Sequence, residues 1–332
     1  NGFDLMIDFF LQKEQLIGSG SLKYNKFLLS QEILKMFMNQ VSSLKSLDYY
    51  SGFAKKVQNI MFVYLPEAKN CLADLRELSC SSDIYSEFFY QISQICHNIQ
   101  SLTIEFGEII SNGLTDLISL QKNLQCLELI CGYNHWMDIV SALTKHHDTL
   151  TRLHIAMAYN NDGLSSFLTS FINLQELVIS YLYMNDKFQH TIFPNLQIFK
   201  ILRDDSTSNS EIFIKFLENN GKNLTDLYIN YYKNNSVNLS IIQHCLNLKN
   251  LVIIIRNNEL DILKNMFNNC QYLESIKVWC GRDYINEEEM LDIVAKDSPK
   301  NFYRLKIYNL EKSKLLPEVL ESFFISWGKR VP

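Results

Sequence analysis

Glycine and proline are scarce in this sequence, with 11 Gly and 5 Pro among 332 residues. Such a composition excludes a collagen-like chain and a proline-rich disordered one. The net charge of −5 argues against a nucleic-acid partner that is bound through a broad basic surface. Long apolar runs are also lacking, since the tightest one, residues 251–255, has only the length of a strand. We therefore expect a globular protein with no nucleic-acid partner and no membrane segment.

Clustered cysteines, which mark disulfide-rich secreted folds, are absent. The eight Cys are scattered, as expected for small buried residues of a protein from a reducing compartment. This pattern predicts a cytoplasmic or nuclear location. Three matches to the glycosylation pattern Asn-x-Ser/Thr, at Asn223, Asn234 and Asn238, keep a secreted protein as an alternative. The Asn, Ser and Thr content alone predicts as many matches by chance.

Catalytic motifs are missing as well: the sequence contains no phosphate-binding loop, nucleophile elbow or zinc-protease motif. Cys126, Cys131 and His135 have metal-ligand residue types, but no Cys-x-x-Cys spacing and no fourth ligand accompany them. We expect no cofactor, no metal and no enzymatic activity.

What the sequence does contain is a repeated unit of the form L-x-x-L-x-L. The first residues of its ten clear occurrences are Leu75, Ile99, Leu124, Leu150, Leu174, Leu196, Leu224, Leu248, Leu273 and Phe302. Their spacing averages about 25 residues, within the range of about 20–29 residues that leucine-rich repeats show. Ten occurrences in one phase indicate a repeat architecture.

Segments with helical periodicity separate these units. They cover residues 86–99, 135–147, 211–217, 259–266 and 286–295. Each repeat is therefore expected to form a strand, a turn and a helix, with the second Leu and the following apolar residue pointing inward. The sequence predicts an α/β leucine-rich-repeat solenoid, a horseshoe with parallel strands on the concave face and helices on the convex face.

The regularity of the repeat divides the chain into four predicted parts. Residues 1–43 form an N-terminal helical lead-in or cap, and residues 44–74 form irregular first repeats. The regular repeats cover residues 75–310. Residues 311–332 form a C-terminal helix, which we interpret as part of a truncated repeat.

Several local signals refine this division. Residues 3–16 are apolar enough for a helix, and residues 18–21, Gly-Ser-Gly-Ser, predict a flexible joint. Ser30 is the expected N-cap of the next helix, Pro317 fits the first turn of the last helix, and residues 330–332 lead toward a further strand.

Two features concern the helix ends and turns. His146 and His147 are expected to be solvated at a helix C-terminus, while the acidic run that follows Asn286 predicts a helix start. The Asn or Cys that often follows the last repeat Leu by three places is replaced here. The residues at this position are Asp83, Gly107, Gly132, Ala158, Leu182, Tyr232, Arg256 and Gly281. The turns must therefore use other hydrogen-bond partners.

The repeat units, together with residues 32–37 (Glu-Ile-Leu-Lys-Met-Phe) and 321–327 (Glu-Ser-Phe-Phe-Ile-Ser-Trp), resemble the ribonuclease-inhibitor-like leucine-rich repeats of fungal-type F-box proteins. The resemblance implies a substrate receptor of a Skp–cullin–F-box ubiquitin ligase, whose repeats hold the target. No F-box is visible, so a Skp-type adaptor would bind only through an F-box outside this sequence. A stand-alone interaction or inhibitor protein and a secreted recognition protein are the alternatives.

The predicted binding surface consists of the outward strand positions beside the inward Leu and Ile. Early repeats place Glu77, Glu105, Glu128 and Glu176 there, together with Arg152 and His154. Later repeats place Lys200, Tyr228, Tyr231, Lys277, Trp279, Arg304, Lys306 and Tyr308. The face thus changes from acidic to basic and aromatic, and aromatic residues and Arg are frequent anchors of protein interfaces. We expect a protein target here, although each residue could also be an ordinary exposed strand residue.

Overall fold

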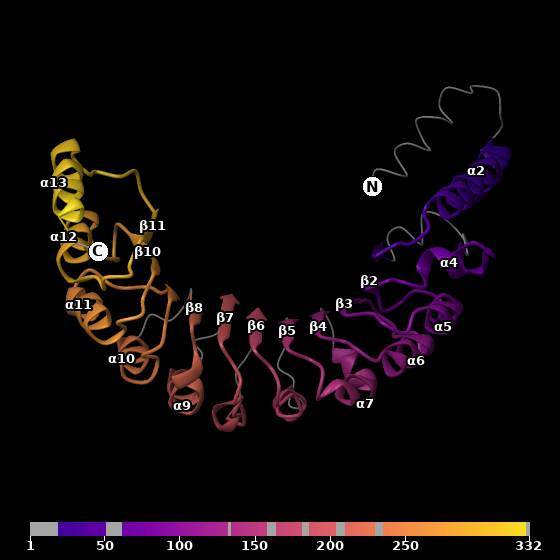
Figure 1. Ribbon diagram of the computed structural model, residues 1–332, viewed down its shortest axis with the longest axis horizontal. Coiled ribbons are helices and arrows are strands. Elements are labelled where there is room, and N and C mark those ends of the chain that lie inside the picture. Colours follow the sequence, from indigo (N-terminus) through magenta and orange to yellow (C-terminus); the bar gives the residue numbers. More distant parts are fainter. Residues whose placement is uncertain are drawn as a thin grey trace. The chain divides into compact units, whose positions relative to one another are not determined.

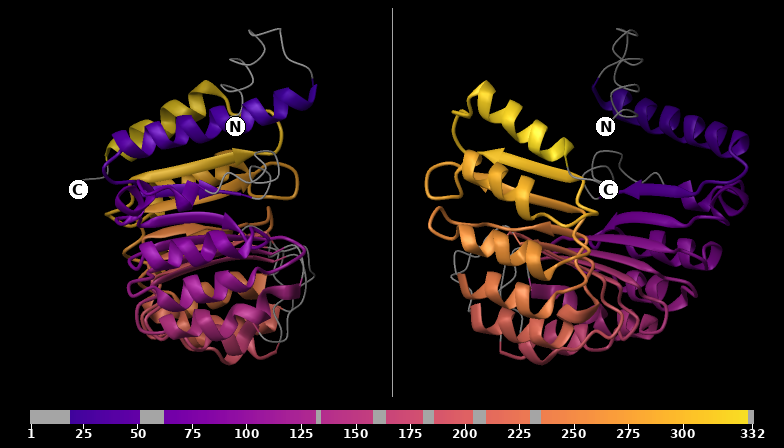
Figure 2. Two further views of the ribbon diagram at one scale, coloured as in Figure 1. Left: turned by 90° about the vertical axis from the view of Figure 1, so that its right-hand side faces the viewer. Right: turned by 60° about the vertical axis from the view of Figure 1, so that its left-hand side comes forward.

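The computed structural model describes residues 19–50, 62–131, 134–157, 164–180, 186–203, 210–229 and 235–329. The chain divides into two compact units, Asn1–Leu150 and Thr151–Pro332. In each unit the helical segments lie on one side of a parallel sheet and leave its other side, here called the strand face, uncovered by helices (Figure 1, Figure 2). This arrangement confirms the predicted α/β leucine-rich-repeat fold.

The first unit pairs its strands in sequence order. β1 pairs with β2, β2 with β3 and β3 with β4, all parallel, and the registers align the repeats so that Leu78 lies opposite Leu102. Its described elements are α2 (Ser19–Gln40), β1 (Ser46–Tyr49), η1 (Phe62–Tyr64), α4 (Ala68–Leu72), β2 (Glu77–Ser81), α5 (Ser86–Ile95), β3 (Ser101–Phe106), α6 (Asn112–Leu120), β4 (Cys126–Cys131), η2 (Asn134–Ile139), α7 (Val140–Leu143) and η3 (Thr144–His146).

The second unit continues the same pattern with strands β5 to β11, each parallel to the next. Its described elements are β5 (Arg152–Met157), α8 (Leu164–Leu168), β6 (Glu176–Ser180), η4 (Phe188–His190), β7 (Ile198–Arg203), α9 (Ser210–Asn220), η5 (Gly221–Asn223), β8 (Asp226–Ile229), α10 (Asn235–His244), β9 (Asn250–Val252), α11 (Leu260–Asn269), β10 (Ser275–Cys280), α12 (Glu287–Asp297), β11 (Arg304–Asn309) and α13 (Pro317–Gly328).

The core lies between each sheet and its helices, as the repeat phase predicts. Leu177 and Ile179 of β6 are fully buried, because alternate strand side chains point toward the helices. Aromatic side chains fill the middle of the second unit, where the Phe216 ring lies 4.7 Å from the rings of both Phe188 and Phe199. The apolar contacts run between neighbouring repeats, which is how a solenoid gains its stability.

Buried polar side chains at the helix ends link several repeats to the preceding one. The Cys96 thiol donates to the Leu72 carbonyl at 3.0 Å, and Gln121 Nε2 donates to the Cys96 carbonyl at 2.9 Å. In the second unit Asn220 Nδ2 donates to the Thr191 carbonyl at 2.9 Å. These residues stand three or four places before a repeat's first apolar residue. They therefore precede the repeat unit, whereas the Asn or Cys of a typical repeat follows it.

His146 belongs to the same set, so the expectation that it is solvated is wrong. Its side chain is buried and its Nε2 lies 2.8 Å from the Ile118 carbonyl oxygen. Burial lowers the pKa of His146 below its ordinary value. Burial thus favours the neutral ring, and in this form the proton must lie on Nε2 for the ring to donate to the carbonyl. His147, by contrast, is exposed as predicted.

The N-terminal local predictions fail within the described residues. α2 begins at Ser19, so Ser30 lies inside the helix instead of capping it, and residues 19–21 are helical instead of forming a joint. No proline occurs between residues 19 and 40, and Gly20 lies in the first turn, so nothing interrupts the helix before Ser30. Residues 3–16 lie outside the described residues.

The C-terminal and cap predictions fare better. The Asn286 side chain caps α12 by accepting from the Glu288 and Glu289 backbone N–H groups, and Pro317 occupies the first turn of α13. Residues 330–332 lie outside the described residues, and the four-part division of the chain stays a prediction. The missing turn residues have a substitute at one described turn, where Ser82 Oγ accepts from the Gly107 N–H at 3.1 Å.

Candidate interaction face

Two or three outward residues per strand form rows across the strand face. In the second unit one row runs through Lys200, Tyr228, Val252, Lys277 and Lys306, because the strand registers place these residues opposite one another. A second row contains Trp279 and Tyr308 at the C-terminal ends of β10 and β11. The repeat therefore sorts outward residues by their position in the strand.

The strand face of the first unit is acidic. Outward positions of β1 to β4 hold Asp48, Glu77, Glu105 and Glu128, and no Lys, Arg or His. Glu77 and Glu105 are exposed, whereas Glu128 is half-buried and accepts from the Thr103 hydroxyl at 3.3 Å. Glu77, Glu105 and Glu128 therefore share the strand face of the first unit, whereas the fourth predicted acidic residue, Glu176, lies on β6 of the second unit.

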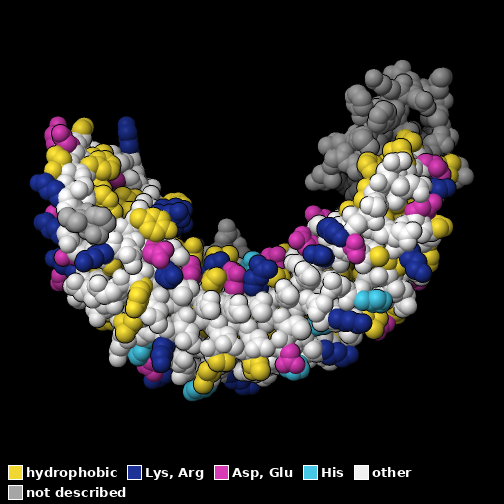
Figure 3. All heavy atoms as spheres, viewed as in Figure 1, with side chains coloured by type: hydrophobic (Ala, Val, Ile, Leu, Met, Phe, Trp, Pro, Cys, Tyr) yellow, Lys and Arg dark blue, Asp and Glu magenta, His cyan; other side chains and the backbone are white. Residues whose placement is uncertain are grey.

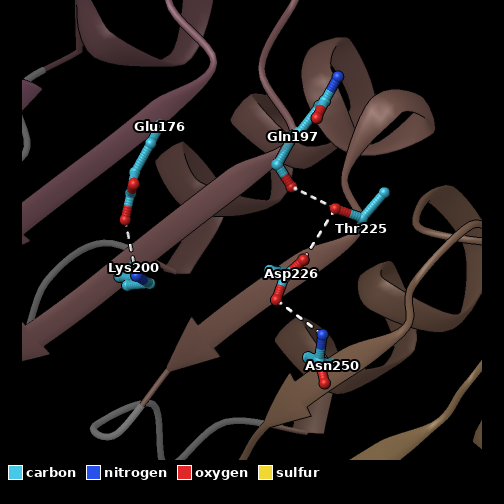
Figure 4. A network of polar contacts seen from close by, with 6 residues as sticks. All are labelled: Glu176, Gln197, Lys200, Thr225, Asp226 and Asn250. Carbon is cyan, nitrogen blue, oxygen red and sulfur yellow. Dashed lines mark hydrogen bonds and ion pairs between the residues drawn. The ribbon is translucent and has the colours of Figure 1, made fainter. Parts of the chain in front are cut away.

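In the middle of the strand face of the second unit, the charged side chains pair with one another or with neighbouring polar groups (Figure 4). Lys200 Nζ lies 2.6 Å from Glu176 Oε1, and the same amine lies 5.4 Å from the centre of the Tyr228 ring. Both side chains of this ion pair are largely buried, with 27% and 22% of their surface exposed. An ion pair of this kind is screened less by salt than an exposed one.

Asp226 completes this part of the face, which we call the central network (Glu176, Lys200, Asp226, Tyr228 and Asn250). Asn250 Nδ2 donates to Asp226 Oδ1 and the Thr225 hydroxyl donates to Asp226 Oδ2, each at 2.8 Å. Figure 4 shows the Asn250–Asp226 bond crossing from β9 to β8, whereas Thr225 directly precedes Asp226 in the chain. The side chains that carry charge in the central network therefore already have partners within the fold.

The strands β10 and β11 carry a different arrangement, the terminal cluster (Lys277, Trp279, Arg304, Lys306 and Tyr308). The rings of Trp279 and Tyr308 stack with their centres 5.7 Å apart and their planes 28° from parallel. Lys277 Nζ lies 4.0 Å from the centre of the Tyr308 ring and 5.2 Å from that of Trp279. Such a cation held over aromatic faces contributes about 0.5–1 kcal/mol at an exposed site.

Arg304 and Lys306 stand on β11 beside these rings, and both side chains are exposed. The Arg304 guanidinium lies 5.6 Å from the centre of the Tyr303 ring. Figure 3 shows basic and hydrophobic side chains together at the β10–β11 end of the second unit. Large rings and cations thus occupy one accessible surface.

The remaining predicted residues lie apart from this cluster. Tyr228 is two strands away from Lys277, a distance of roughly 10 Å for adjacent strands about 4.8 Å apart. Arg152 and His154 are on β5 at the other end of the sheet, where His154 Nε2 lies 3.4 Å from Ser180 Oγ. Tyr231 lies outside the described residues.

Candidate chemical groups are few on the described part of the chain. Within it, no set of three or more His, Cys, Asp or Glu residues could hold a metal ion. Burial raises the pKa of Cys80, Cys96, Cys270 and Cys280 to about 12, so these thiols stay protonated at neutral pH and are poor nucleophiles. The side chains of Cys131 and His135 lie outside the described residues.

Among the described helices, none combines the length and the apolar character that a membrane crossing requires.

No protein-family model and no curated protein matches the chain. Solved structures do resemble it. The leucine-rich-repeat-containing protein LegL7 of Legionella pneumophila is 12% identical with a TM-score of 0.47, covering 87% of this chain and 92% of LegL7. Yeast Rad7, solved in complex with Elc1, is 12% identical with a TM-score of 0.50, covering 91% and 97%. The internalin InlF of Listeria monocytogenes is 13% identical with a TM-score of 0.42, covering 90% and 87%.

This likeness is one of fold alone. The strand order and the helix positions described above are those of a leucine-rich-repeat array.

Proposed function

We propose that this chain is a non-catalytic protein-binding scaffold, the target-recognition region of an F-box subunit of a Skp–cullin–F-box ubiquitin ligase. The terminal cluster is the observation that carries the binding role. Trp279 and Tyr308 offer stacked rings next to cations on an accessible sheet surface. Aromatic and Arg side chains of this kind supply most of the binding energy in many protein interfaces.

The ligase assignment is supported by the resemblance of the repeat units and of the two helical segments to fungal-type F-box proteins. Yeast Rad7, which shares the fold, is in complex with another protein, Elc1, in its solved structure. In this proposal the repeats hold the target in the cytoplasm or nucleus, and an F-box elsewhere in the protein engages the Skp-type adaptor.

Two of the three glycosylation matches argue against the secreted alternative. Asn238 is buried and its Nδ2 donates to the Ile254 carbonyl at 3.0 Å. Asn223 Nδ2 donates to the Pro194 carbonyl at 2.8 Å. A glycan could not be attached to the buried Asn238 without opening the fold around it, and on Asn223 it would leave Nδ2 only one of its two N–H groups for the Pro194 carbonyl.

Affinity capture with a double variant tests the binding role. Trp279→Ala with Tyr308→Ala should remove the proteins that the parent chain captures from a lysate, while the melting temperature stays the same because neither side chain is part of the buried core. The matched control is Tyr90→Ala with Tyr272→Ala, since these exposed tyrosines lie off the strand face. Undiminished capture by the first variant would overturn the assignment of the face.

The ligase role needs a separate measurement. The complete protein should co-purify with a Skp-type adaptor, and deletion of its F-box should abolish that association. A complete protein that binds no adaptor would overturn the ligase role and leave the scaffold role to the capture experiment.

A further inference from the structure

The terminal cluster combines three cations with no carboxylate. The outward residues of β10 are Ser275, Lys277 and Trp279, and those of β11 are Arg304, Lys306 and Tyr308. Within the part of the chain that the structure describes, none of these three cations forms an ion pair with a carboxylate, although eight such pairs are present elsewhere. The positive charge of this surface is therefore not neutralised by the fold.

A lysine of the central network, in contrast, has a carboxylate partner. There, Lys200 occupies the same row as Lys277 and Lys306 but binds Glu176 at 2.6 Å. The row thus has room for a carboxylate beside its lysines. A carboxylate or phosphate of a partner could supply the terminal cluster with the negative charge that Glu176 supplies to Lys200.

The cluster is ordered along the strand direction. Arg304, Lys306 and Tyr308 are alternate residues of one strand, so they point the same way about 7 Å apart. The register places Lys277 beside Lys306 and Trp279 beside Tyr308. Cations therefore occupy the start and middle of β11 and the middle of β10, and the aromatic pair occupies the end of both strands.

Lys277 joins the two halves of the cluster. Its amine lies over the Tyr308 ring at 4.0 Å and over the Trp279 ring at 5.2 Å. The ring faces attract this cation but carry no negative charge that would offset it. An occupant that rests an apolar side chain on the rings therefore meets a positive charge within the same contact.

We propose that the terminal cluster binds an extended acidic segment of a partner protein, with an anionic group over Arg304 and Lys306 and an apolar side chain on Trp279 and Tyr308. The spacing of the cluster fits an anion and an apolar residue two positions apart in an extended peptide. The anion is a carboxylate or a phosphate monoester. This inference rests on the proposed binding function and names the class of target segment.

Fluorescence anisotropy with the whole chain and labelled synthetic peptides tests the proposal. One peptide carries Glu residues two positions from a Leu, a second replaces each Glu by Gln, and a third replaces one Glu by phosphoserine. We expect the Glu or phosphoserine peptide to bind, with affinity falling as salt rises from about 50 to about 300 mM, and the Gln peptide to bind at least about tenfold more weakly. The stronger of the two anionic peptides identifies the source of the anion.

Charge reversal locates the binding. Arg304→Glu with Lys306→Glu should weaken the anionic peptides by at least about tenfold, because like charges then face the ligand. The matched control is Lys264→Glu with Lys296→Glu, which makes the same change of charge on α11 and α12. All four side chains are exposed, so both variants should fold.

Three outcomes would overturn the inference: equal binding of the Gln peptide, no loss on charge reversal at β11, or binding of a labelled single-stranded oligonucleotide in place of all peptides. The proposed function fails differently, when Trp279→Ala with Tyr308→Ala leaves partner capture unchanged. A third result is that partner capture is lost in that variant but unaffected by Arg304→Glu with Lys306→Glu. This outcome would refute the proposal that the bound segment is acidic, while the assignment of the binding face would stand.

Discussion

The central network and the terminal cluster occupy equivalent positions of neighbouring repeats and use similar residues, yet only the central network satisfies its own charges. Lys200 binds Glu176 and lies over Tyr228, and Asp226 is held by Thr225 and Asn250. Lys277 lies over two rings with no carboxylate partner in the described structure. A lysine beside a tyrosine on a strand face does not by itself indicate a binding site. Whether its charge can bind a partner depends on whether a carboxylate of a neighbouring strand already pairs with it.

The two regions also differ beneath the surface, which predicts the largest effect. Leu177 of β6 and Leu305 of β11 occupy the same repeat position, but Leu177 is fully buried whereas Leu305 is half-buried. Leu177→Ala should lower the free energy of unfolding by about 2–5 kcal/mol. Leu305→Ala should cost less, roughly 1–2 kcal/mol, since less apolar surface is lost.

Chemical denaturation of both variants, with the parent chain beside them, measures this difference. The chemistry of the substitution is the same at both sites, so burial is the variable. Equal losses would mean that β11 is packed as tightly as β6, and no loss at Leu177 would mean that the repeat phase is wrong.

Much of this fold could be predicted from the sequence because a solenoid makes its structure locally. The L-x-x-L-x-L unit predicts both the strand and its buried side, and Asn286 followed by glutamates predicts the start of α12, which the structure confirms. The failures have equally local causes. Ser30 has the chemistry of a cap, but the residues before it also form helix, and a cap needs a residue outside the helical conformation.

The candidate site was less predictable because its contacts join residues that are far apart in the sequence. The outward position of Lys200, Lys277 and Tyr308 follows from strand alternation alone. The partners do not, because Glu176 precedes Lys200 by 24 positions and only the parallel register brings their side chains together. The stacking of Trp279 on Tyr308, and the separation of Tyr228 from both, likewise depend on which strands are neighbours.

Single tyrosine variants sharpen the comparison at the level of binding. Tyr308→Ala should weaken partner capture by about tenfold or more, because this residue is 47% exposed and its ring contacts both Trp279 and Lys277. Tyr228→Ala should change capture less than about threefold, since its row neighbour Lys200 is already paired. Quantitative capture of the same partner by both variants checks this order, and a larger loss for Tyr228→Ala would move the binding site to the central network.

Removing one carboxylate should make the central network resemble the terminal cluster. Glu176→Gln leaves Lys200 without its partner, so acidic peptides should bind roughly two- to fivefold more tightly, the range expected for one charge pair near the surface. Glu218→Gln is the matched control, because it frees Lys215 from an ion pair of the same 2.6 Å length on α9. Anisotropy titrations with the Glu peptide measure both, and an equal gain in the control would indicate nonspecific attraction.

The smallest effect concerns the carboxylate that lies just beyond β11. Arg282 Nε donates to Glu311 Oε1 at 2.8 Å, and this hydrogen bond, together with the charge of Arg282, lowers the pKa of the Glu311 carboxyl below its ordinary value. Because the pKa is lowered in the fold, the stabilisation is complete above the ordinary carboxyl pKa and is lost as the pH falls through the lowered value. Both side chains are exposed, so the effect on the free energy of unfolding should be small.

Carbon-13 NMR titration of the Glu311 carboxyl should show its midpoint rising to the ordinary carboxyl range in Arg282→Gln. The midpoint should not move in Arg304→Glu with Lys306→Glu, because the hydrogen bond that lowers the pKa of Glu311 comes from Arg282. A midpoint that responded to the β11 variant instead would show that the fold supplies the terminal cluster with a carboxylate after all. The distinction between the two regions of the strand face would then disappear.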